Sequence, residues 1–122
     1  MTTRGIRGAT TVTADQPGLV LAATTELLEA ILHGNPNLKA EDIASALFTT
    51  TDDLVSAYPA LAARQMGWVN VPMMCAREIP VPGSLPRCVR VLIQWNTNCV
   101  QTAIKHVYLR DAVSLRPDLV VS

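Results

Sequence analysis

The sequence has few charged residues: Asp, Glu, Lys and Arg make up 16% of its 122 residues, against roughly 25% in ordinary soluble domains. Ten basic and ten acidic residues balance one another, which argues against a nucleic-acid-binding protein and against a polybasic membrane anchor. Apolar residues nevertheless reach 49%. A small domain has a large surface for its volume, so a charge-poor surface favours burial against further copies of the same chain. We therefore expect a homo-oligomer.

Several segments and motifs are also absent. The longest apolar stretch, 19–32, contains two glutamates and is too short for a membrane span, and the first residues lack the apolar core of a secretory signal. Three cysteines, an odd number, fit free thiols in a reducing cytoplasm. There is no CxxC pair and no glycine-rich phosphate loop, and the sequence has only two histidines. We expect no metal and no cofactor.

The pattern along the chain predicts one α+β domain over residues 1–122. Apolar residues at helical spacing predict a long helix up to Gly34, with Asp15 as its N-terminal cap. Pro59 and Gly67 bracket a short helix over 60–66. Five segments have the character of strands and predict a mixed β-sheet: 2–12, 43–50, 68–75, 88–95 and 107–110.

Arginine outnumbers lysine eight to two, and the charges are unevenly distributed. Residues 54–122 hold seven bases against three acids, a net charge of +4, and could line an anion-binding pocket. Most of these arginines fit equally well on a solvated surface. Arg90 differs, because it interrupts the most apolar strand, where an unpaired charge is costly. Its partner is either Glu78, in a structural ion pair, or a ligand, and composition does not decide between them.

A series of short motifs runs from end to end of the chain and resembles the trimeric, Bacillus-type AroH class of chorismate mutases. The order and spacing of the whole set carry the resemblance, since any one motif alone is weak. The matching segments are RGIRGATTV at 4–12, YPA at 58–60 followed by Arg64, GW at 67–68, VP at 71–72 followed by Cys75 and Glu78, CVRV at 88–91, HVYL at 106–109 and LRPDL at 115–119.

The resemblance implies an isomerase that rearranges chorismate to prephenate in the shikimate route to aromatic amino acids. It further implies a cytoplasmic homotrimer with a barrel-like core and three active sites at subunit interfaces. The rearrangement is unimolecular and pericyclic, with no proton transfer and no covalent enzyme intermediate. An enzyme for it has to orient the substrate and stabilise negative charge on the ether oxygen. It needs no Ser-His-Asp set, which this sequence lacks.

The same resemblance assigns roles to individual residues. Arg90 would donate to the ether oxygen and to a carboxylate of the substrate, and Glu78 would accept a hydrogen bond from the ring hydroxyl. The remaining substrate-binding residues would be Arg7 and Tyr108 at the enolpyruvyl carboxylate, Cys75 at the ring hydroxyl, Arg64 and Arg116 at the mouth, and Tyr58, Ala60, Met73, Met74 and Leu115 in an apolar wall. Cys75 could equally be a small buried residue, and Met73 and Met74 could be plain core residues.

Two positions depart from the family pattern. Leu61 stands where members can carry a lysine, and Met74 replaces a smaller polar residue, so we expect altered substrate affinity with the rearrangement intact. Two other functions remain open on the residues alone. One is an imine or enamine deaminase-like trimer, which a 2-aminoacrylate assay would detect. The other is a non-catalytic anion-binding trimer, which chorismate consumption would exclude.

Overall fold

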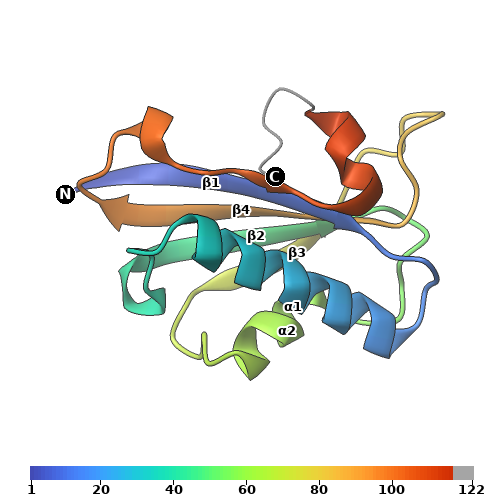
Figure 1. Ribbon diagram of the computed structural model, residues 1–122. Coiled ribbons are helices and arrows are strands. Elements are labelled where there is room, and N and C mark those ends of the chain that lie inside the picture. The colour runs from blue at the N-terminus through green and yellow to red at the C-terminus, as the bar shows by residue number, and fades with distance from the viewer. Residues whose placement is uncertain (117–122) are drawn as a thin grey trace.

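A computed structural model describes residues 1–116 of the chain. Five strands form one sheet in the order β3-β2-β4-β1-β5, and two α-helices lie together on one side of it (Figure 1). The strands are β1 (Thr2–Thr11), β2 (Ile43–Thr50), β3 (Met73–Arg77), β4 (Cys88–Thr97) and β5 (Val107–Tyr108), and the helices are α1 (Pro17–Gly34) and α2 (Pro59–Gln65). The predicted α+β class, with a mixed sheet and one long and one short helix, is confirmed.

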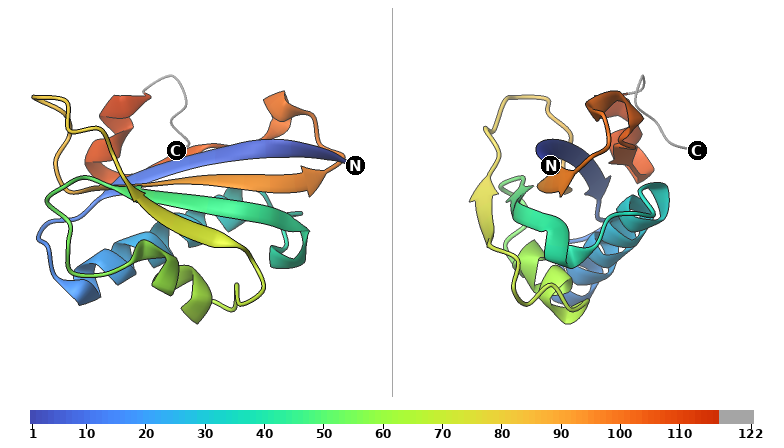
Figure 2. Two further views of the ribbon diagram at one scale, coloured as in Figure 1. Left: turned by 180° about the vertical axis from the view of Figure 1, so that it is seen from behind. Right: turned by 90° about the vertical axis from the view of Figure 1, so that its left-hand side faces the viewer.

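The central strand β4 fixes the order of the sheet. It pairs antiparallel with β1 on one side and with β2 on the other, whereas β3 and β5 add in parallel at the two edges. Figure 2 shows the sheet twisting along its length, with α1 and α2 on the same face. Parallel addition requires a long connection, and α2 lies in the connection from β2 to β3.

The side chains of β4 alternate between a buried face and a more exposed one. Val89, Val91, Ile93 and Trp95 are all buried and face the helices. There they meet the apolar side of α1, which contributes Leu27, Leu28 and Ile31 to the main core. The other face of β4 carries Arg90, Leu92 and Gln94, which are half-buried or exposed. The sheet therefore has one packed face and one face that is largely uncovered.

Gly8 allows α1 to approach β1 closely. A Cβ atom at this position would lie 2.8 Å from Cδ1 of Ile31 and 3.3 Å from the carbonyl oxygen of Val107. Both distances are shorter than ordinary packing contacts, so a side chain at this position would force the Ile31 side chain and the backbone of β5 to shift. The glycine thereby sets how closely β1 can lie to α1 and β5, one residue after Arg7.

The uncovered face is closed at one end only. There the short helix Arg110–Leu115 covers a small cluster that contains Ala9, Cys88, Tyr108 and Ala112. Towards the other end, Leu47 and Leu92 are direct cross-strand partners, and each is 39% exposed. Adjacent apolar side chains in the middle of an open sheet face favour contact with another surface.

Three local expectations are wrong. Asp15 does not cap α1: the N-cap is Gln16, and the Asp15 carboxylate instead accepts hydrogen bonds from the backbone N–H groups of Val55 and Ser56. The third strand begins at Met73 rather than at residue 68, since Trp68 is a buried core side chain and Pro72 has no N–H to donate. The last strand ends at Tyr108, because Arg110 has a positive φ of 54°.

Candidate active site

Arg90 lies in the middle of the uncovered sheet face. Its backbone is paired with Thr49 of β2 on one side and with Ala9 of β1 on the other, so its position is fixed from both directions. The side chain is 39% exposed, yet Nε is buried and has no hydrogen-bond partner among the described residues. A buried, charged N–H group without an acceptor is costly in a folded protein. An acceptor from a ligand would remove that cost.

Glu78 directly follows β3 and faces Arg90 across the sheet. Its Oε2 lies 3.8 Å from Nε of Arg90, too far for a hydrogen bond. The same oxygen accepts a hydrogen bond from the hydroxyl of Thr49, and the backbone N–H of Glu78 donates to the carbonyl of Thr50 at 3.0 Å. Glu78 is therefore held by β2, and its pairing with Arg90 is loose. A tight structural ion pair, one of the two interpretations of Arg90, does not form.

Arg90 and Glu78 share a cavity of about 170 Å3 with two more of the predicted residues, Arg7 and Tyr108. Apolar side chains of β2 and β4 complete the lining, among them Leu47 and Leu92. The four predicted polar residues come from β1, β4, β5 and the end of β3. The sheet therefore brings together side chains that are up to 101 positions apart in the sequence. Two arginines, a phenol and a carboxylate around one cavity suit a ligand with carboxylates and a hydroxyl group.

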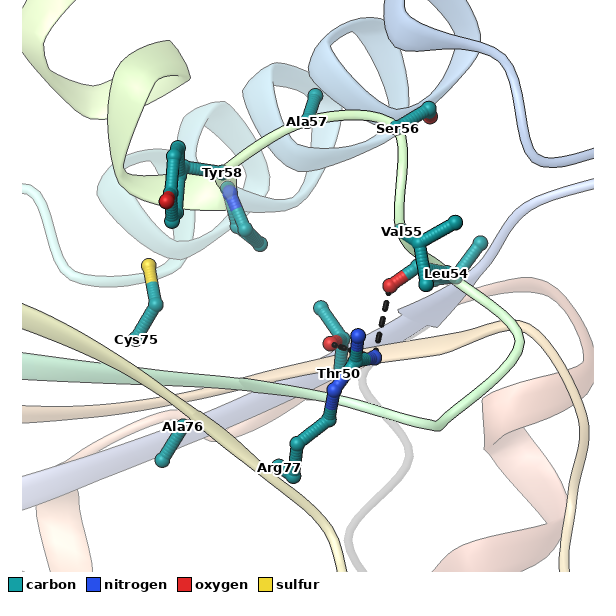
Figure 3. A pocket seen from close by; sticks show the side chains of 10 residues that line it. Thr50, Leu54, Val55, Ser56, Ala57, Tyr58, Cys75, Ala76 and Arg77 are labelled. Atoms are coloured by element: carbon teal, nitrogen blue, oxygen red, sulfur yellow. Dashed lines mark hydrogen bonds between the residues drawn. The ribbon is translucent and has the colours of Figure 1, made fainter.

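A second cavity, of about 350 Å3, contains Tyr58 and Cys75 and none of the four residues around Arg90. Figure 3 shows Tyr58 and Cys75 on one side of this cavity and the guanidinium of Arg77 on the other. Nη1 of Arg77 donates to the carbonyls of Thr51 and Leu54, each at 2.8 Å. These hydrogen bonds hold the loop 51–58 against β3. Six of the predicted site residues thus fall into two separate groups, four around Arg90 and two in this second cavity.

The other predicted residues are distributed between the surface and the core. Arg64 is exposed on α2, and Ala60 is buried in the main core. Met73 and Cys75 pack partly against that core, whereas Met74 points to the uncovered face beside Leu47 and is 71% exposed. Leu115 packs against the cluster around Tyr108. Arg116 is half-buried at the end of the described chain.

Comparison with known proteins identifies the family of this chain. The family model described as chorismate mutase type I matches residues 3–119, nearly the whole chain. The chain belongs to the type I chorismate mutase family. A relative from Thermus thermophilus, "Chorismate mutase AroH", is 56% identical over 116 residues, which cover 95% of each chain. Another of the same name from Bacillus subtilis is 45% identical over 120 residues, covering 98% of this chain and 94% of the relative.

A solved structure supports the same assignment. The chorismate mutase from Clostridium thermocellum superposes with a TM-score of 0.88 and is 46% identical, covering 90% of this chain and 97% of the other. The resemblance read from the sequence motifs is therefore confirmed, and the protein is a chorismate mutase, an isomerase. These matches favour the mutase over the deaminase-like and non-catalytic alternatives. Within residues 1–116, no helix is long and apolar enough to cross a membrane.

The pKa values of two groups near the Arg90 cavity are shifted in this chorismate mutase. Burial raises the pKa of the Cys88 thiol, which therefore stays neutral beside Arg90 and adds no competing negative charge. Burial lowers the pKa of His106, and the positive charges of Arg7 and Arg116 lower it further. No cluster of three or more His, Cys, Asp or Glu side chains within residues 1–116 could hold a metal ion.

Sequence reasoning missed three residues that shape the two cavities. Thr49, which holds Glu78, lies opposite Arg90 in the β2–β4 register, and that register cannot be read without the structure. Leu92 lies two residues after Arg90 in β4 and lines the same cavity, which its apolar character alone does not indicate. Arg77 was grouped with ordinary surface arginines, although it bonds two backbone carbonyls. Its position one residue before Glu78 gave no signal of that role.

Proposed function

We propose that this chorismate mutase, a single domain, acts as a homotrimer and rearranges chorismate to prephenate at three sites shared between neighbouring protomers. In each site Arg90 stabilises the transition state. The observation that carries this assignment is the buried Nε of Arg90, which has no acceptor among the described residues although it lines a cavity with Arg7, Glu78 and Tyr108. The ether oxygen of chorismate would supply the missing acceptor.

The rearrangement breaks a C–O bond and forms a C–C bond within one molecule, so the enzyme has no proton to move. Negative charge grows on the ether oxygen as the C–O bond lengthens. A guanidinium fixed beside that oxygen interacts more strongly with the transition state than with the substrate, and this difference accelerates the reaction. Arg90 suits the role because it is always charged and its backbone is held between two strands.

The other residues of this cavity would bind and fold the substrate. Arg7 and Tyr108 would hold the enolpyruvyl carboxylate, which brings the flexible arm over the ring. Glu78 would accept a hydrogen bond from the ring hydroxyl. Its loose contact with Arg90 and its firm contact with Thr49 support this role, because the carboxylate is positioned without neutralising the cation.

The second group of residues would complete the site from a neighbouring protomer. Tyr58, Cys75 and Arg64 do not line the Arg90 cavity within residues 1–116 of one chain. Tyr58 is 73% exposed although it is a large aromatic side chain. Seated against the Arg90 cavity of the next protomer, Tyr58 and Cys75 would cover the substrate and Arg64 would add positive charge at the mouth. Ala60, Met73, Met74 and Leu115 would add apolar lining, and Arg116 further charge.

The uncovered sheet face would form the contact between protomers. It carries the exposed pair Leu47 and Leu92 next to the Arg90 cavity, and Met74 lies beside them at the edge. Burying these side chains would be favourable by about 25 cal/mol for each Å2 removed from water. The low overall charge of the chain fits a protein that hides part of its surface in this way.

A chorismate-consumption assay with identification of prephenate tests the activity itself. The shared site requires a second test, in which two damaged variants are mixed. One variant is Arg90→Met, and the other is the double variant Tyr58→Asp, Arg64→Glu, whose positions are exposed in the single chain. After unfolding and joint refolding, random trimers should contain both intact halves at about a quarter of their sites, and activity should reappear.

A matched mixture serves as the control. Arg90→Met mixed with Arg7→Ala damages the same half of the site in both chains, so mixing should add no activity beyond that of the separate proteins. Restored activity in the first mixture only would support a site shared between protomers. If neither mixture gains activity although native mass spectrometry detects mixed trimers, the site is contained within one chain and the arrangement is wrong.

A further inference from the structure

Along the edge of β1 that faces β5, the backbone of β1 forms hydrogen bonds with side chains as well as with backbone groups. Towards its C-terminal end the pairing is regular, and the N–H of Leu109 donates to the carbonyl of Ala9 at 2.9 Å. At Arg7, two residues earlier, the backbone N–H donates to Nδ1 of His106 at 2.9 Å. The carbonyl of Lys105, the residue before His106, accepts a hydrogen bond from the Asn35 side chain. The imidazole thus serves as the acceptor for Arg7.

From this arrangement we propose that His106 is a positioning residue for substrate binding: its neutral imidazole fixes the backbone of Arg7 and thereby the place of the Arg7 guanidinium. The inference rests on the proposed role of Arg7 in holding a substrate carboxylate. It assigns to His106 no contact with the substrate. His106 acts only through Arg7.

The chemistry of the contact requires one protonation state. Nδ1 can accept a hydrogen bond only when its lone pair is free, so the proton of the neutral ring must be on Nε2. Burial lowers the pKa of His106, and the nearby charges of Arg7 and Arg116 act in the same direction. The imidazole is therefore neutral at neutral pH and available as an acceptor.

Two further contacts keep His106 in place. The buried side chain of Asn35, just after α1, accepts from the N–H of Lys105 and donates to its carbonyl, both at 3.0 Å. On the other side of His106, β5 begins at Val107. The backbone of His106 is thus held between an anchored residue and a strand, which fixes the point from which the imidazole reaches the N–H of Arg7.

The same edge offers a matched control. The side chain of Gln101 pairs with the backbone of Gly5, accepting from its N–H at 3.1 Å and donating to its carbonyl at 2.7 Å. Gly5 is two residues before Arg7 on the same edge, but Gly5 has no side chain to bind substrate. Loosening this contact tests whether general damage to the edge is enough to weaken substrate binding.

The decisive comparison uses two conservative replacements of His106. His106→Asn keeps an acceptor oxygen at the position of Nδ1, whereas His106→Gln moves that oxygen one bond further out. We expect His106→Asn to keep KM for chorismate within about twofold. We expect His106→Gln to raise it about tenfold with kcat nearly unchanged, as for one misplaced hydrogen bond in substrate binding. Gln101→Ala should leave KM unchanged.

Several results would overturn the proposal. Equal KM values for His106→Asn and His106→Gln would remove the role of Nδ1, and a similar rise of KM in Gln101→Ala would indicate general loosening of the edge. Nitrogen NMR of the unmodified enzyme at pH 7.5, which depends on no variant, should detect the Nε2–H form. A proton on Nδ1 would contradict the proposal.

Arg7→Ala separates this proposal from the proposed function. If it raises KM while His106→Gln does not, only the role of His106 falls. If Arg7→Ala leaves KM unchanged, the assignment of Arg7 falls and takes the role of His106 with it.

Discussion

Replacing Arg90 by methionine is expected to abolish most of the activity while leaving the stability of the protein nearly unchanged. Methionine approximates the length of the arginine side chain but carries no charge and no donor. Nε of Arg90 has no hydrogen-bond partner among the described residues, and the nearest carboxylate oxygen, on Glu78, lies 3.8 Å away. Glu78 keeps its hydrogen bond from Thr49 after the change. Because the side chain is 39% exposed, the loose ion pair contributes little, and the unfolding free energy should change by less than about 1 kcal/mol.

The expected effect on catalysis is much larger. Arg90 would be the charged donor to the ether oxygen, where negative charge develops only in the transition state. Loss of one such donor typically costs about 2.7–4 kcal/mol of activation free energy, or roughly 100- to 1000-fold in kcat. Because the ground state carries less charge at that oxygen, kcat should fall by a larger factor than KM rises.

The assay follows the loss of chorismate absorbance at saturating substrate, alongside thermal unfolding and molecular mass of the same samples. Arg90→Lys is the matched variant, since it keeps the charge but loses the planar donor set, and its activity should lie between those of Arg90→Met and the unaltered protein. A Met variant with kcat within tenfold of the unaltered protein would refute the role of Arg90. So would a loss of stability large enough to account for the lost activity.

Three further predictions address the fold and the chemistry. Gly8→Ala should lower the unfolding free energy by about 1–3 kcal/mol in urea titrations, because its Cβ would collide with Ile31; an unchanged midpoint would contradict the close approach. The Ser56 side chain, together with backbone N–H groups, lowers the pKa of Asp15 below 3.8. The ionised Asp15 carboxylate therefore contributes its full stabilisation above about pH 4, and this stabilisation is lost as the pH falls through the lowered pKa of Asp15. Between pH 5 and 2, the unfolding free energy of Asp15→Asn should therefore depend less on pH than that of the unaltered protein. The same dependence on pH in both proteins would argue against a contribution from Asp15. EDTA should leave kcat unchanged, since the rearrangement needs no metal; loss of activity that a divalent ion restores would disprove this.

The elements that local pattern determines were predicted well from the sequence. The strand over 88–95 and the long helix α1 were both identified, because each follows from the side-chain pattern of one element. The error at β3 has a different origin. Trp68 and Met73 are both apolar, but Trp68 packs in the core before the strand begins, and Met73 is the first residue of β3. Apolar character alone does not separate a core side chain in a loop from a strand residue.

A site residue could be predicted where its chemical character differs from that of its neighbours in the sequence. Arg90 stood out because a charge interrupts an apolar strand, and the structure brings it together with Arg7, Glu78 and Tyr108 in one cavity. The contacts of Thr49 and His106 were not predictable, since each depends on the register between strands that are distant in sequence. The resemblance to known enzymes supplied the roles of the residues, which remain predictions.

The position of Arg90 on the central strand accounts for how it could remain ready for a substrate. Arg77, the last residue of the edge strand β3, is paired on one side only, and its guanidinium donates to the carbonyl oxygens of Thr51 and Leu54. The backbone of Arg90 is paired on both sides along β4, so this backbone cannot move to bring Nε closer to an acceptor. The free-energy cost of burying this N–H without an acceptor is therefore present in the folded protein. A ligand oxygen that accepts a hydrogen bond from Nε removes this cost. Donors held in place before the reaction need no reorganisation as charge develops, which is the condition for efficient electrostatic catalysis.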